Sequence, residues 1–236
     1  MQFTAGNFYV WAMKKGMEAA EILASEEIKA VLFDFDGIII DSEWPIYESW
    51  KRVFEGEGQT LAVETYVQCI GSDFDTWSPE KYLEELTGKE FDWPTINAQR
   101  QVELESDLVG VQPLPGVLDL FEKITNDGSM KLAIVSSSTH RWVDSWLEKL
   151  DLLRYTEEVV CRGDAPRIKP APDLYLEAVK RFSLQPAECL VIEDSFNGII
   201  AGKAAGCKTI AVPSRLTNCL DFSKADAVIS SLTDLL

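Results

Sequence analysis

The sequence predicts an α/β protein in which a doubly wound parallel sheet carries an all-helical insertion. Short apolar runs that are continuous rather than alternating are typical of parallel strands buried on both faces. Helical patterns lie between the later runs, as a doubly wound sheet requires. About a hundred residues separate the first run from the second, too many for one crossover helix. The predicted strands are Ala30–Phe35, Lys131–Val135, Glu158–Cys161, Cys189–Ile192, Thr209–Val212 and Ala227–Ile229.

Three core helices are predicted between the later strands. The first places apolar residues on one helical face after Ser138 and Thr139, which could cap it. The last is followed by Gly206 at the position where a helix commonly ends in a left-handed residue. The apolar face of the first helix comprises Trp142, Val143, Trp146, Leu147 and Leu150, and the other two helices are Leu174–Phe182 and Asn197–Ala205.

The long gap after the first strand contains further helical patterns and ends near Pro113-Leu114-Pro115-Gly116. We therefore expect a Rossmann-like core formed by residues 29–41 and 114–236, with a helical insertion at 42–113. Residues 1–28 are expected to be an N-terminal extension that is partly helical, with a short acidic helix at Met17–Glu27. The helices predicted in the insertion are Trp44–Glu55, Val63–Cys69, Pro79–Thr87 and Thr95–Leu108.

The charge balance excludes several classes of partner. Twenty-two basic residues stand against 39 acidic ones, for a net charge of −17. Such a surface repels nucleic acid and anionic lipid, so we expect neither nucleic-acid nor membrane binding. A site for a phosphorylated substrate would need local positive potential from a metal, a lysine or a helix N-terminus.

The five cysteines have irregular spacing and no C-x-x-C pair, which indicates neither a zinc site nor a disulfide framework. Reduced thiols and the lack of a signal-peptide pattern predict a cytoplasmic protein. No apolar run has the length that spans a bilayer. We expect the chain to act as a monomer.

Two aspartates, Asp34 and Asp36, end the first predicted strand and precede Gly37. Ligands of open α/β sheets bind at the carboxyl ends of strands. A strand repeat of two directs both carboxylates to the same side, and two like charges so close call for a bound cation. The alternative is a pair of acids that caps a helix or turn.

Further polar residues follow the other strands. Ser136 ends the second strand, where a hydroxyl can hold a phosphate, although a turn serine would look the same. Lys169 precedes a helix, and Pro170 and Pro172 after it fix the approach of the chain to that helix. A solvated surface lysine is its alternative. Glu193 and Asp194 end the fourth strand and offer the oxygen ligands that Mg²⁺ prefers, or a helix N-cap.

Together these motifs resemble the haloacid dehalogenase-like hydrolase superfamily, in its helical-cap branch, which includes β-phosphoglucomutase-like proteins and small phosphatases. The resemblance covers roughly residues 29 to 230, and four ordered motifs make a chance match improbable. The matching stretches are Phe33-Asp34-Phe35-Asp36-Gly37 with Asp41-Ser42-Glu43, Val135-Ser136-Ser137-Ser138, Lys169-Pro170-Ala171-Pro172-Asp173-Leu174-Tyr175, and Glu193-Asp194-Ser195 with Gly198-Ile199 and Ala205-Gly206.

The resemblance implies a role for each motif. Asp34 is the expected nucleophile, and Asp36 the general acid and then base. Ser136, Ser137 and Lys169 are expected to bind phosphate. An Mg²⁺ ion is expected on Asp34, Asp36, Glu193 and Asp194, and the substrate would be a small phosphorylated metabolite.

Within the superfamily, Asp36 favours phosphate chemistry, because dehalogenases lack this second aspartate. The mutase branch carries a histidine shortly after the first motif and a basic cap residue for a second phosphate. Neither occurs in Asp41–Tyr47 or in Cys69–Phe74, which favours a phosphatase over a β-phosphoglucomutase-like enzyme. Lys51 and Arg52 are the cap cations expected to come nearest the cleft. A non-enzymatic binding protein is a third hypothesis, which the complete set of catalytic acids disfavours.

Other conspicuous residues are expected to be structural. His140, the single histidine, should begin a helix near the phosphate site. The tryptophans should mostly pack in the core, and Trp44 and Trp77 could also meet substrate at the cap entrance.

Overall fold

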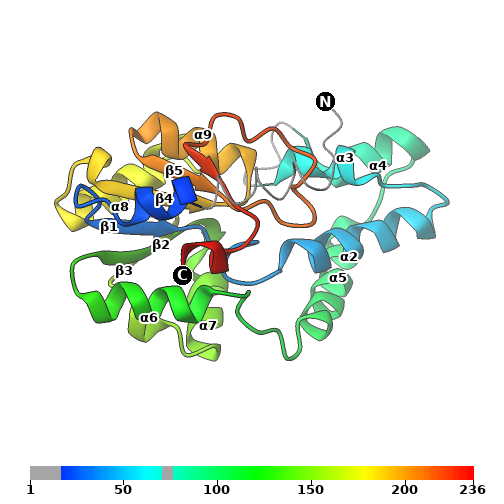
Figure 1. Ribbon diagram of the computed structural model, residues 1–236. Coiled ribbons are helices and arrows are strands. Elements are labelled where there is room, and N and C mark those ends of the chain that lie inside the picture. The colour runs from blue at the N-terminus through cyan, green and yellow to red at the C-terminus, as the bar shows by residue number, and fades with distance from the viewer. Residues whose placement is uncertain (1–16, 71–76) are drawn as a thin grey trace, which may run out of the picture.

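The computed structural model describes residues 17–70 and 77–236. Its central feature is a six-stranded parallel sheet in the order β3-β2-β1-β4-β5-β6 (Figure 1). This order, with the first strand in the middle, confirms the predicted doubly wound sheet. The strands are β1 (Ala30–Phe33), β2 (Lys131–Thr139), β3 (Glu158–Arg162), β4 (Cys189–Glu193), β5 (Lys208–Ala211) and β6 (Ala227–Val228).

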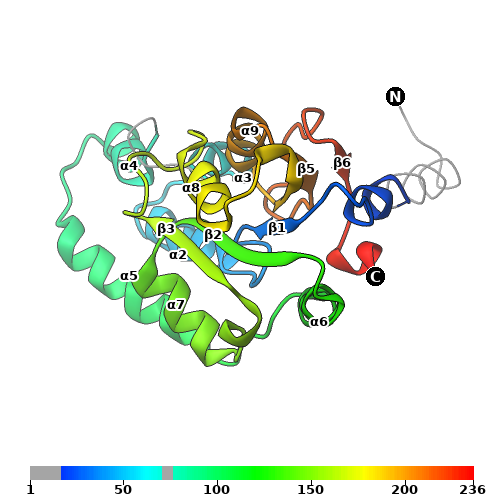
Figure 2. The ribbon, with the colours of Figure 1, turned by 90° about the vertical axis from the view of Figure 1, so that its left-hand side faces the viewer.

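Helices cover both faces of the sheet, because its strands are apolar on both sides. In β1 the side chains alternate: Val31 and Phe33 enter one hydrophobic layer, and Ala30 and Leu32 enter the other. Figure 2 shows α6 and α7 on one face and α8 and α9 on the other. These helices are α6 (Val117–Asp127), α7 (His140–Lys149), α8 (Asp173–Phe182) and α9 (Phe196–Ala205).

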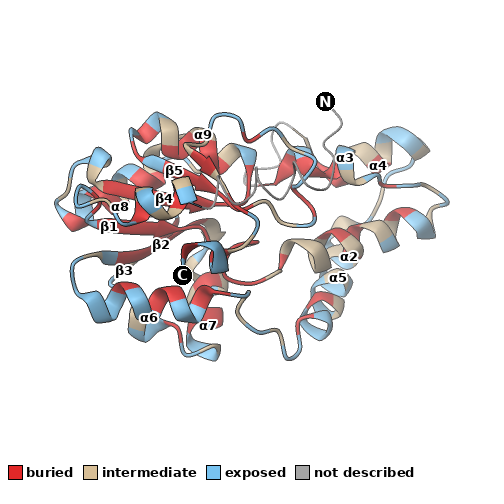
Figure 3. Cartoon of the chain, viewed as in Figure 1, coloured by how far each residue is buried: buried red, intermediate tan, exposed pale blue. Residues whose placement is uncertain are grey.

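The helical insertion forms a cap beside the carboxyl edge of the sheet (Figure 1). Its own core is rich in aromatic rings, such as Tyr47 against Tyr66, with ring centroids 5.2 Å apart, and Trp50 against Trp93 at 6.2 Å. Figure 3 shows the buried faces of these helices turned inward. The cap elements are α2 (Glu43–Gly56), α3 (Val63–Tyr66), η1 (Val67–Cys69), α4 (Pro79–Thr87) and α5 (Trp93–Asp107).

The extension before the sheet is helical at residues 17–23, so the described helix ends before the predicted Glu27. Ala19 and Leu23 are buried against the core layer that contains α6 and α7. Three short 3-10 helices complete the core: η2 (Leu153–Tyr155), η3 (Pro186–Glu188) and η4 (Leu232–Leu235). In the parts of the chain that are described, no helix has both the length and the apolar character needed to cross a membrane.

Several predicted boundaries were wrong. The first strand ends at Phe33, not Phe35, because the chain turns back over residues 34–40, with Gly37 at φ +79° donating its N–H to the Ile40 carbonyl. The second strand continues past Ser136 to Thr139 after a shift in its register with β3. Neither predicted cap bonds the helix: Thr139 makes no capping bond to α7, and the Ser138 hydroxyl donates to Asp36.

The helix α6 was not predicted. It begins after Gly116, whose φ is +87° and where a Cβ would lie 2.6 Å from the Thr233 nitrogen. Its buried residues are Val117, Leu120, Phe121 and Ile124, which follow the ordinary helical spacing.

Core and cap are joined by more than the two linkers. Leu216, in the loop after β5, is 1% exposed and packs in the aromatic core of the cap. The Asn197 side chain of α9 donates to the Ile70 carbonyl at 2.8 Å. Arg215 pairs with Asp41 at 3.3 Å and lies over the Trp44 ring at 4.0 Å.

Candidate active site

A cavity of about 330 Å³ lies between the carboxyl edge of the sheet and the cap. The predicted catalytic pair, the phosphate-binding residues and Asp194 line it together. Glu193 does not line the cavity but bonds to Lys169, which does, and it is fully buried. The fold brings these residues together because each lies at the carboxyl end of a parallel strand or in the loop that follows one. The predicted residues that line the cavity are Asp34, Asp36, Ser136, Ser137, Lys169 and Asp194.

Lys169 is the centre of a buried ionic network. Its ammonium group donates to Asp34 Oδ1 at 2.6 Å, to Glu193 Oε1 at 2.7 Å and to the Val135 carbonyl at 2.8 Å. The side chain is only 1% exposed. Burial alone would lower the pKa of Lys169, but Asp34 and Glu193 outweigh it and hold the pKa well above its usual value. A permanent positive charge therefore stands beside Asp34.

Both carboxylate oxygens of Glu193 accept hydrogen bonds. Its Oε1 accepts from Lys169 and from the Tyr175 hydroxyl at 2.8 Å, and its Oε2 accepts from the backbone and side chain of Ser195 at 3.1 and 2.9 Å. The carboxylate lies against Gly198, where a Cβ would come within 1.7 Å of Oε1. Both oxygens are already engaged, so Glu193 has little capacity left for a metal.

Asp194 is in the opposite situation. It is 1% exposed, and among the described residues neither of its carboxylate oxygens has a hydrogen-bond partner. Burial, together with Glu193 and Asp34, raises its pKa well above the usual range. An unpartnered buried carboxylate is costly unless something binds it.

These acids fit a divalent cation. Oxygens of Asp34, Glu193 and Asp194 lie within 4.8 Å of one another, and all three residues are buried. Burial and Glu193 raise the pKa of Asp34 to about 7, although Lys169 opposes the shift. Three carboxylates against one ammonium leave negative charge that a hard cation with oxygen ligands can neutralise. Asp34 and Asp194 are the residues with oxygens free to hold it.

Asp36 does not join this acidic group, although it was predicted as a metal ligand. Its Oδ1 accepts from the Ser42 hydroxyl at 2.6 Å and from the Trp142 indole at 2.9 Å, and its Oδ2 accepts from the Ser138 hydroxyl at 2.7 Å. The three donors come from the start of the cap, from α7 and from β2. The side chain is therefore fixed in the cavity, apart from the other three carboxylates.

The segment predicted to bind phosphate, Ser136 and Ser137, lies at an irregularity of the sheet. The register of β2 with β3 shifts between Val135 and Thr139, and the Ser136 hydroxyl accepts from the Ser138 N–H at 3.0 Å. The Ser137 hydroxyl oxygen is buried and has no partner in the described structure. Arg162 Nε donates to the Ser137 carbonyl at 3.0 Å and so spans the interrupted ladder.

Sequence reasoning gave no site role to several residues of the cavity wall, among them Glu43, Trp142 and Arg162. Arg162 ends β3, so the rule that located the other site residues at strand ends would have found it. Trp142 falls on an apolar helical face, and its spacing gave no sign that its indole N–H reaches Asp36. Burial, Asp36 and Asp34 raise the pKa of Glu43 to about 8.

The cap contributes apolar and neutral polar groups to the cavity besides Glu43. Lys51 does not line it and pairs with Glu48 at 3.5 Å, while Arg52 pairs with Asp107 at 2.8 Å on the outside of the cap. Residues 71–74 of the predicted cap stretch lie outside the described residues. The other cap residues at the cavity are Ile46, Tyr66, Cys69, Ile70, Gln101 and Leu104.

The tryptophans at the cap entrance have packing roles. Trp44 lies against Tyr47, with ring centroids 5.4 Å apart, and under Arg215. Trp77 lies between Tyr66 and Tyr82, with centroid distances of 6.4 and 5.8 Å. Neither lines the cavity.

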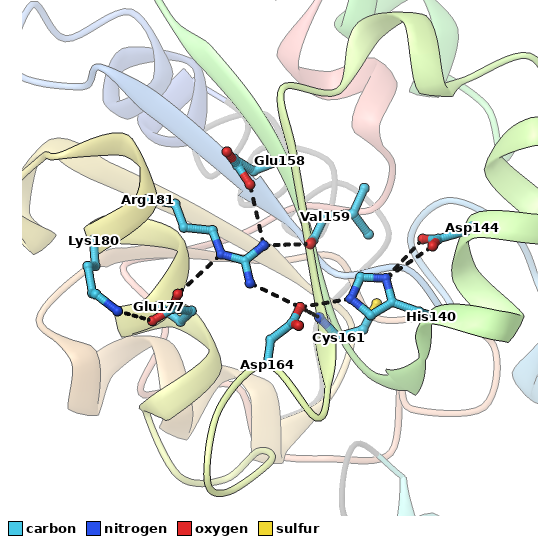
Figure 4. Close-up of polar contacts among 9 residues, drawn as sticks. All are labelled: His140, Asp144, Glu158, Val159, Cys161, Asp164, Glu177, Lys180 and Arg181. Atoms are coloured by element: carbon cyan, nitrogen blue, oxygen red, sulfur yellow. Dashed lines mark hydrogen bonds and ion pairs between the residues drawn. The ribbon is translucent and has the colours of Figure 1, made fainter.

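A polar network joins the start of α7, the end of β3 and α8 (Figure 4). His140, the first residue of α7, bonds Asp144 at 3.1 Å and Asp164 at 2.8 Å. Asp164 also accepts from the Cys161 N–H at 3.0 Å and pairs with Arg181 of α8 at 3.3 Å. Burial lowers the pKa of His140, but its bonds to Asp164 and Asp144 outweigh this and raise it above its usual value.

Comparison with known proteins agrees with this geometry. The family model described as haloacid dehalogenase-like hydrolase matches residues 31–212. YhcW of Bacillus subtilis (strain 168), which is named as a phosphatase, is 35% identical over 208 residues, with 88% of this chain and 94% of that protein covered. Fructose-1-phosphate phosphatase YqaB of Escherichia coli (strain K12) is 29% identical, with 79% and 97% covered.

Solved structures share the fold. The crystal structure of β-phosphoglucomutase from Clostridium difficile superimposes with a TM-score of 0.69 at 21% identity, over 89% of this chain and 93% of that one. The extent of the family match and the identity to YhcW are decisive. The chain belongs to the haloacid dehalogenase-like hydrolases and is an enzyme of that family.

Proposed function

We propose that the protein is an Mg²⁺-dependent phosphatase of small phosphorylated metabolites, which acts through an aspartyl-phosphate on Asp34. The observation that carries this proposal is the difference between the two aspartates. Asp34 is 6% exposed and bonded to a buried lysine, whereas Asp36 is held by three uncharged donors. This difference supports a nucleophile role for Asp34 and a proton-transfer role for Asp36.

Attack by Asp34 forms a bond from its free carboxylate oxygen to phosphorus, while the bond from phosphorus to the leaving alkoxide breaks. Lys169 offsets the repulsion between the carboxylate and the phosphate dianion. Asp36 donates a proton to the leaving alkoxide. Water then attacks phosphorus, Asp36 takes its proton, and the bond between phosphorus and Asp34 breaks to release inorganic phosphate.

The remaining residues bind and orient the phosphate. Ser136 and the unpartnered hydroxyl of Ser137 lie in the cavity wall as hydrogen-bond donors. Asp34 and Asp194 would hold Mg²⁺, and Glu193 would fix Lys169 between them. The ion, when bound, supplies positive charge that stabilises the negative charge of the transferring phosphoryl group.

The mutase alternative needs a cap cation for a second phosphate. Lys51 and Arg52 are engaged elsewhere, and the described part of the cap places neither lysine nor arginine in the cavity wall. Supplying β-glucose 1-phosphate with a trace of glucose 1,6-bisphosphate tests this alternative. We expect phosphate release without glucose 6-phosphate, and efficient formation of that isomer would favour the mutase.

The phosphatase proposal is tested by a panel of phosphorylated metabolites and p-nitrophenyl phosphate, with Mg²⁺ or with excess EDTA. We expect Mg²⁺-dependent phosphate release, and poor support by Ca²⁺, which prefers more ligands at longer distances. Full turnover in EDTA would contradict the metal requirement.

The nucleophile is tested by Asp34→Asn, which is nearly isosteric. We expect it to lower kcat by a factor on the order of 10³ or more, because a carboxamide is a poor nucleophile. Acid quenching of wild-type enzyme during turnover, followed by mass spectrometry, should find a phosphoryl group on the peptide that contains Asp34. A variant with near wild-type kcat would refute the covalent route.

A further inference from the structure

Arg162 is an arginine of the cavity wall with no acidic partner in the described structure. It is exposed, which places it at the rim of the cavity. The chain as a whole is acidic, with 39 acidic and 22 basic residues. The nearest acid in the sequence, Asp164, is engaged by His140 and Arg181 (Figure 4). Five other arginines pair with carboxylates: Arg52, Arg154, Arg167, Arg181 and Arg215.

The guanidinium group of Arg162 is held in one place but is only partly used. Its Nε donates to the Ser137 carbonyl at 3.0 Å, and its other N–H groups have no hydrogen-bond partner among the residues that the structure describes. This bond anchors the group above the end of β2, which lies beside β1 in the sheet. Asp34 directly follows β1, so Arg162, at the end of β3, lies two strands away across β2 and lines the same cavity as Asp34.

A phosphate at Asp34 is already provided with a cation in Lys169, which contacts Asp34 directly. A second anionic group would face Asp36 and Glu43 in the same cavity. It would need positive charge of its own, and the planar fork of an arginine matches a carboxylate or a phosphate.

We propose that Arg162 forms a subsite for a second anionic group on the substrate. This group is a carboxylate or a second phosphate elsewhere on the same substrate molecule. The proposal rests on the phosphatase function proposed above, because that function places the first phosphate at Asp34.

The test uses pairs of compounds that differ in the second group alone. The carboxylate arm compares 3-phosphoglycerate with glycerol 3-phosphate. The phosphate arm compares fructose 1,6-bisphosphate with fructose 1-phosphate. Each compound is titrated as a competitor of p-nitrophenyl phosphate hydrolysis, and its binding to an Asp34→Asn background with Mg²⁺ is measured by calorimetry, so that a compound that is not turned over still gives a result.

Three variants are compared with the wild type. Arg162→Gln removes the charge and retains a hydrogen-bond donor for Ser137, and Arg162→Lys retains the charge without the fork. Arg141→Gln makes the same charge change at an exposed residue of α7 outside the cavity wall. Circular dichroism and thermal unfolding establish that each variant is folded.

We expect the wild type to bind the anionic member of at least one pair about tenfold or more tightly than the neutral member. Arg162→Gln should weaken binding of the anionic member about tenfold and leave the neutral member within about threefold. Arg162→Lys should fall between the two, and Arg141→Gln should match the wild type. The arm that shows the selective loss identifies the second group as carboxylate or phosphate.

Two results would overturn the proposal. One is a wild type without preference for either anionic member. The other is an Arg162→Gln enzyme that loses affinity equally for both members of each pair, since this would mean that Arg162 only supports the Ser137 carbonyl. A wild type that hydrolyses no phosphate ester would instead refute the proposed function, whatever calorimetry shows for Arg162.

Discussion

Asp34 and Asp36 are two residues apart, yet their carboxyl groups have different surroundings. Asp34 shares a buried space with Glu193 and Asp194, and within the described residues Lys169 is the one cation paired with Asp34 and Glu193. Asp36 is half-buried and bonded to two hydroxyls and an indole. The turn after β1, with Gly37 in the left-handed region, separates the two side chains.

We expect the Asp194 carboxylate to account for most of the change in melting temperature that Mg²⁺ causes. Saturating Mg²⁺ should raise the melting temperature of the wild type, because a ligand of the folded state stabilises it. Asp194→Asn should lose this response and should melt at a higher temperature than the metal-free wild type, since it removes a buried charge that burial disfavours. Glu90→Gln, at an exposed cap residue, is the control. A full Mg²⁺ shift in Asp194→Asn would exclude it as a ligand.

Glycine should be needed at position 37 for two reasons. Its backbone is left-handed, and a side chain there would collide with Asp194. A Cβ at Gly37 would lie 2.2 Å from Asp194 Oδ2, whereas a Cβ at Gly58, at φ +71°, meets nothing within 4 Å. Both alanine variants should pay the cost of left-handed backbone, about 1–2 kcal/mol. Only Gly37→Ala should also lose the Mg²⁺ shift in melting temperature. Equal behaviour of the two variants would show that strain alone matters.

At the scale of elements, His140 joins the start of α7 to the loop after β3. It faces Asp144 on its own helix and Asp164 on the loop, and Arg181 of α8 approaches Asp164 from the other side. Because the pKa of His140 is raised in the folded state, its charge contributes stability below the unfolded pKa of about 6.5. That contribution is lost as the pH rises through the folded pKa.

His140→Asn should therefore lower the melting temperature more at pH 6 than at pH 9. Wild type and variant are compared by thermal unfolding at several pH values. Once the pH has risen through the folded pKa, the histidine is neutral in both the folded and the unfolded chain, so the difference should shrink. If the difference in melting temperature between wild type and variant stays constant from pH 6 to pH 9, the hydrogen bonds of His140 stabilise the fold and its charge does not.

The sheet and most helices could be predicted from the sequence, because continuous apolar runs and helical spacing are local signals. The end of β2 could not: Ser136–Thr139 is polar and looks like a turn, while the ladder resumes at Thr139 opposite Arg162 through a partner far along the chain. The strand-end rule also located the residues of the site. It could not show that Asp36 turns toward Trp142, because that contact depends on packing between β1 and α7.

At the scale of the molecule, Leu216 of the core packs into the hydrophobic cluster of the cap and so connects the two parts. Leu216→Ala should lower the free energy of unfolding by about 2–4 kcal/mol, because it leaves a cavity where the two parts meet. Leu118→Ala, at a leucine of α6 that is 41% exposed, should cost far less. Denaturant unfolding monitored by fluorescence and by circular dichroism measures both. A small effect at Leu216 would mean that the cap packs independently of the core loop.

The central position of β1 has a consequence for the order in which the chain can fold during synthesis. Ala30 pairs with Lys131 on one side and with Cys189 on the other, so β1 has no sheet partner until at least a hundred further residues have been made. The helices of the cap are complete before either partner exists, and α2 and α5 can already contact each other. A ribosome-bound chain that stops before Lys131 should thus contain structured cap helices beside an unpaired apolar strand. That strand is the segment that a chaperone would most need to protect.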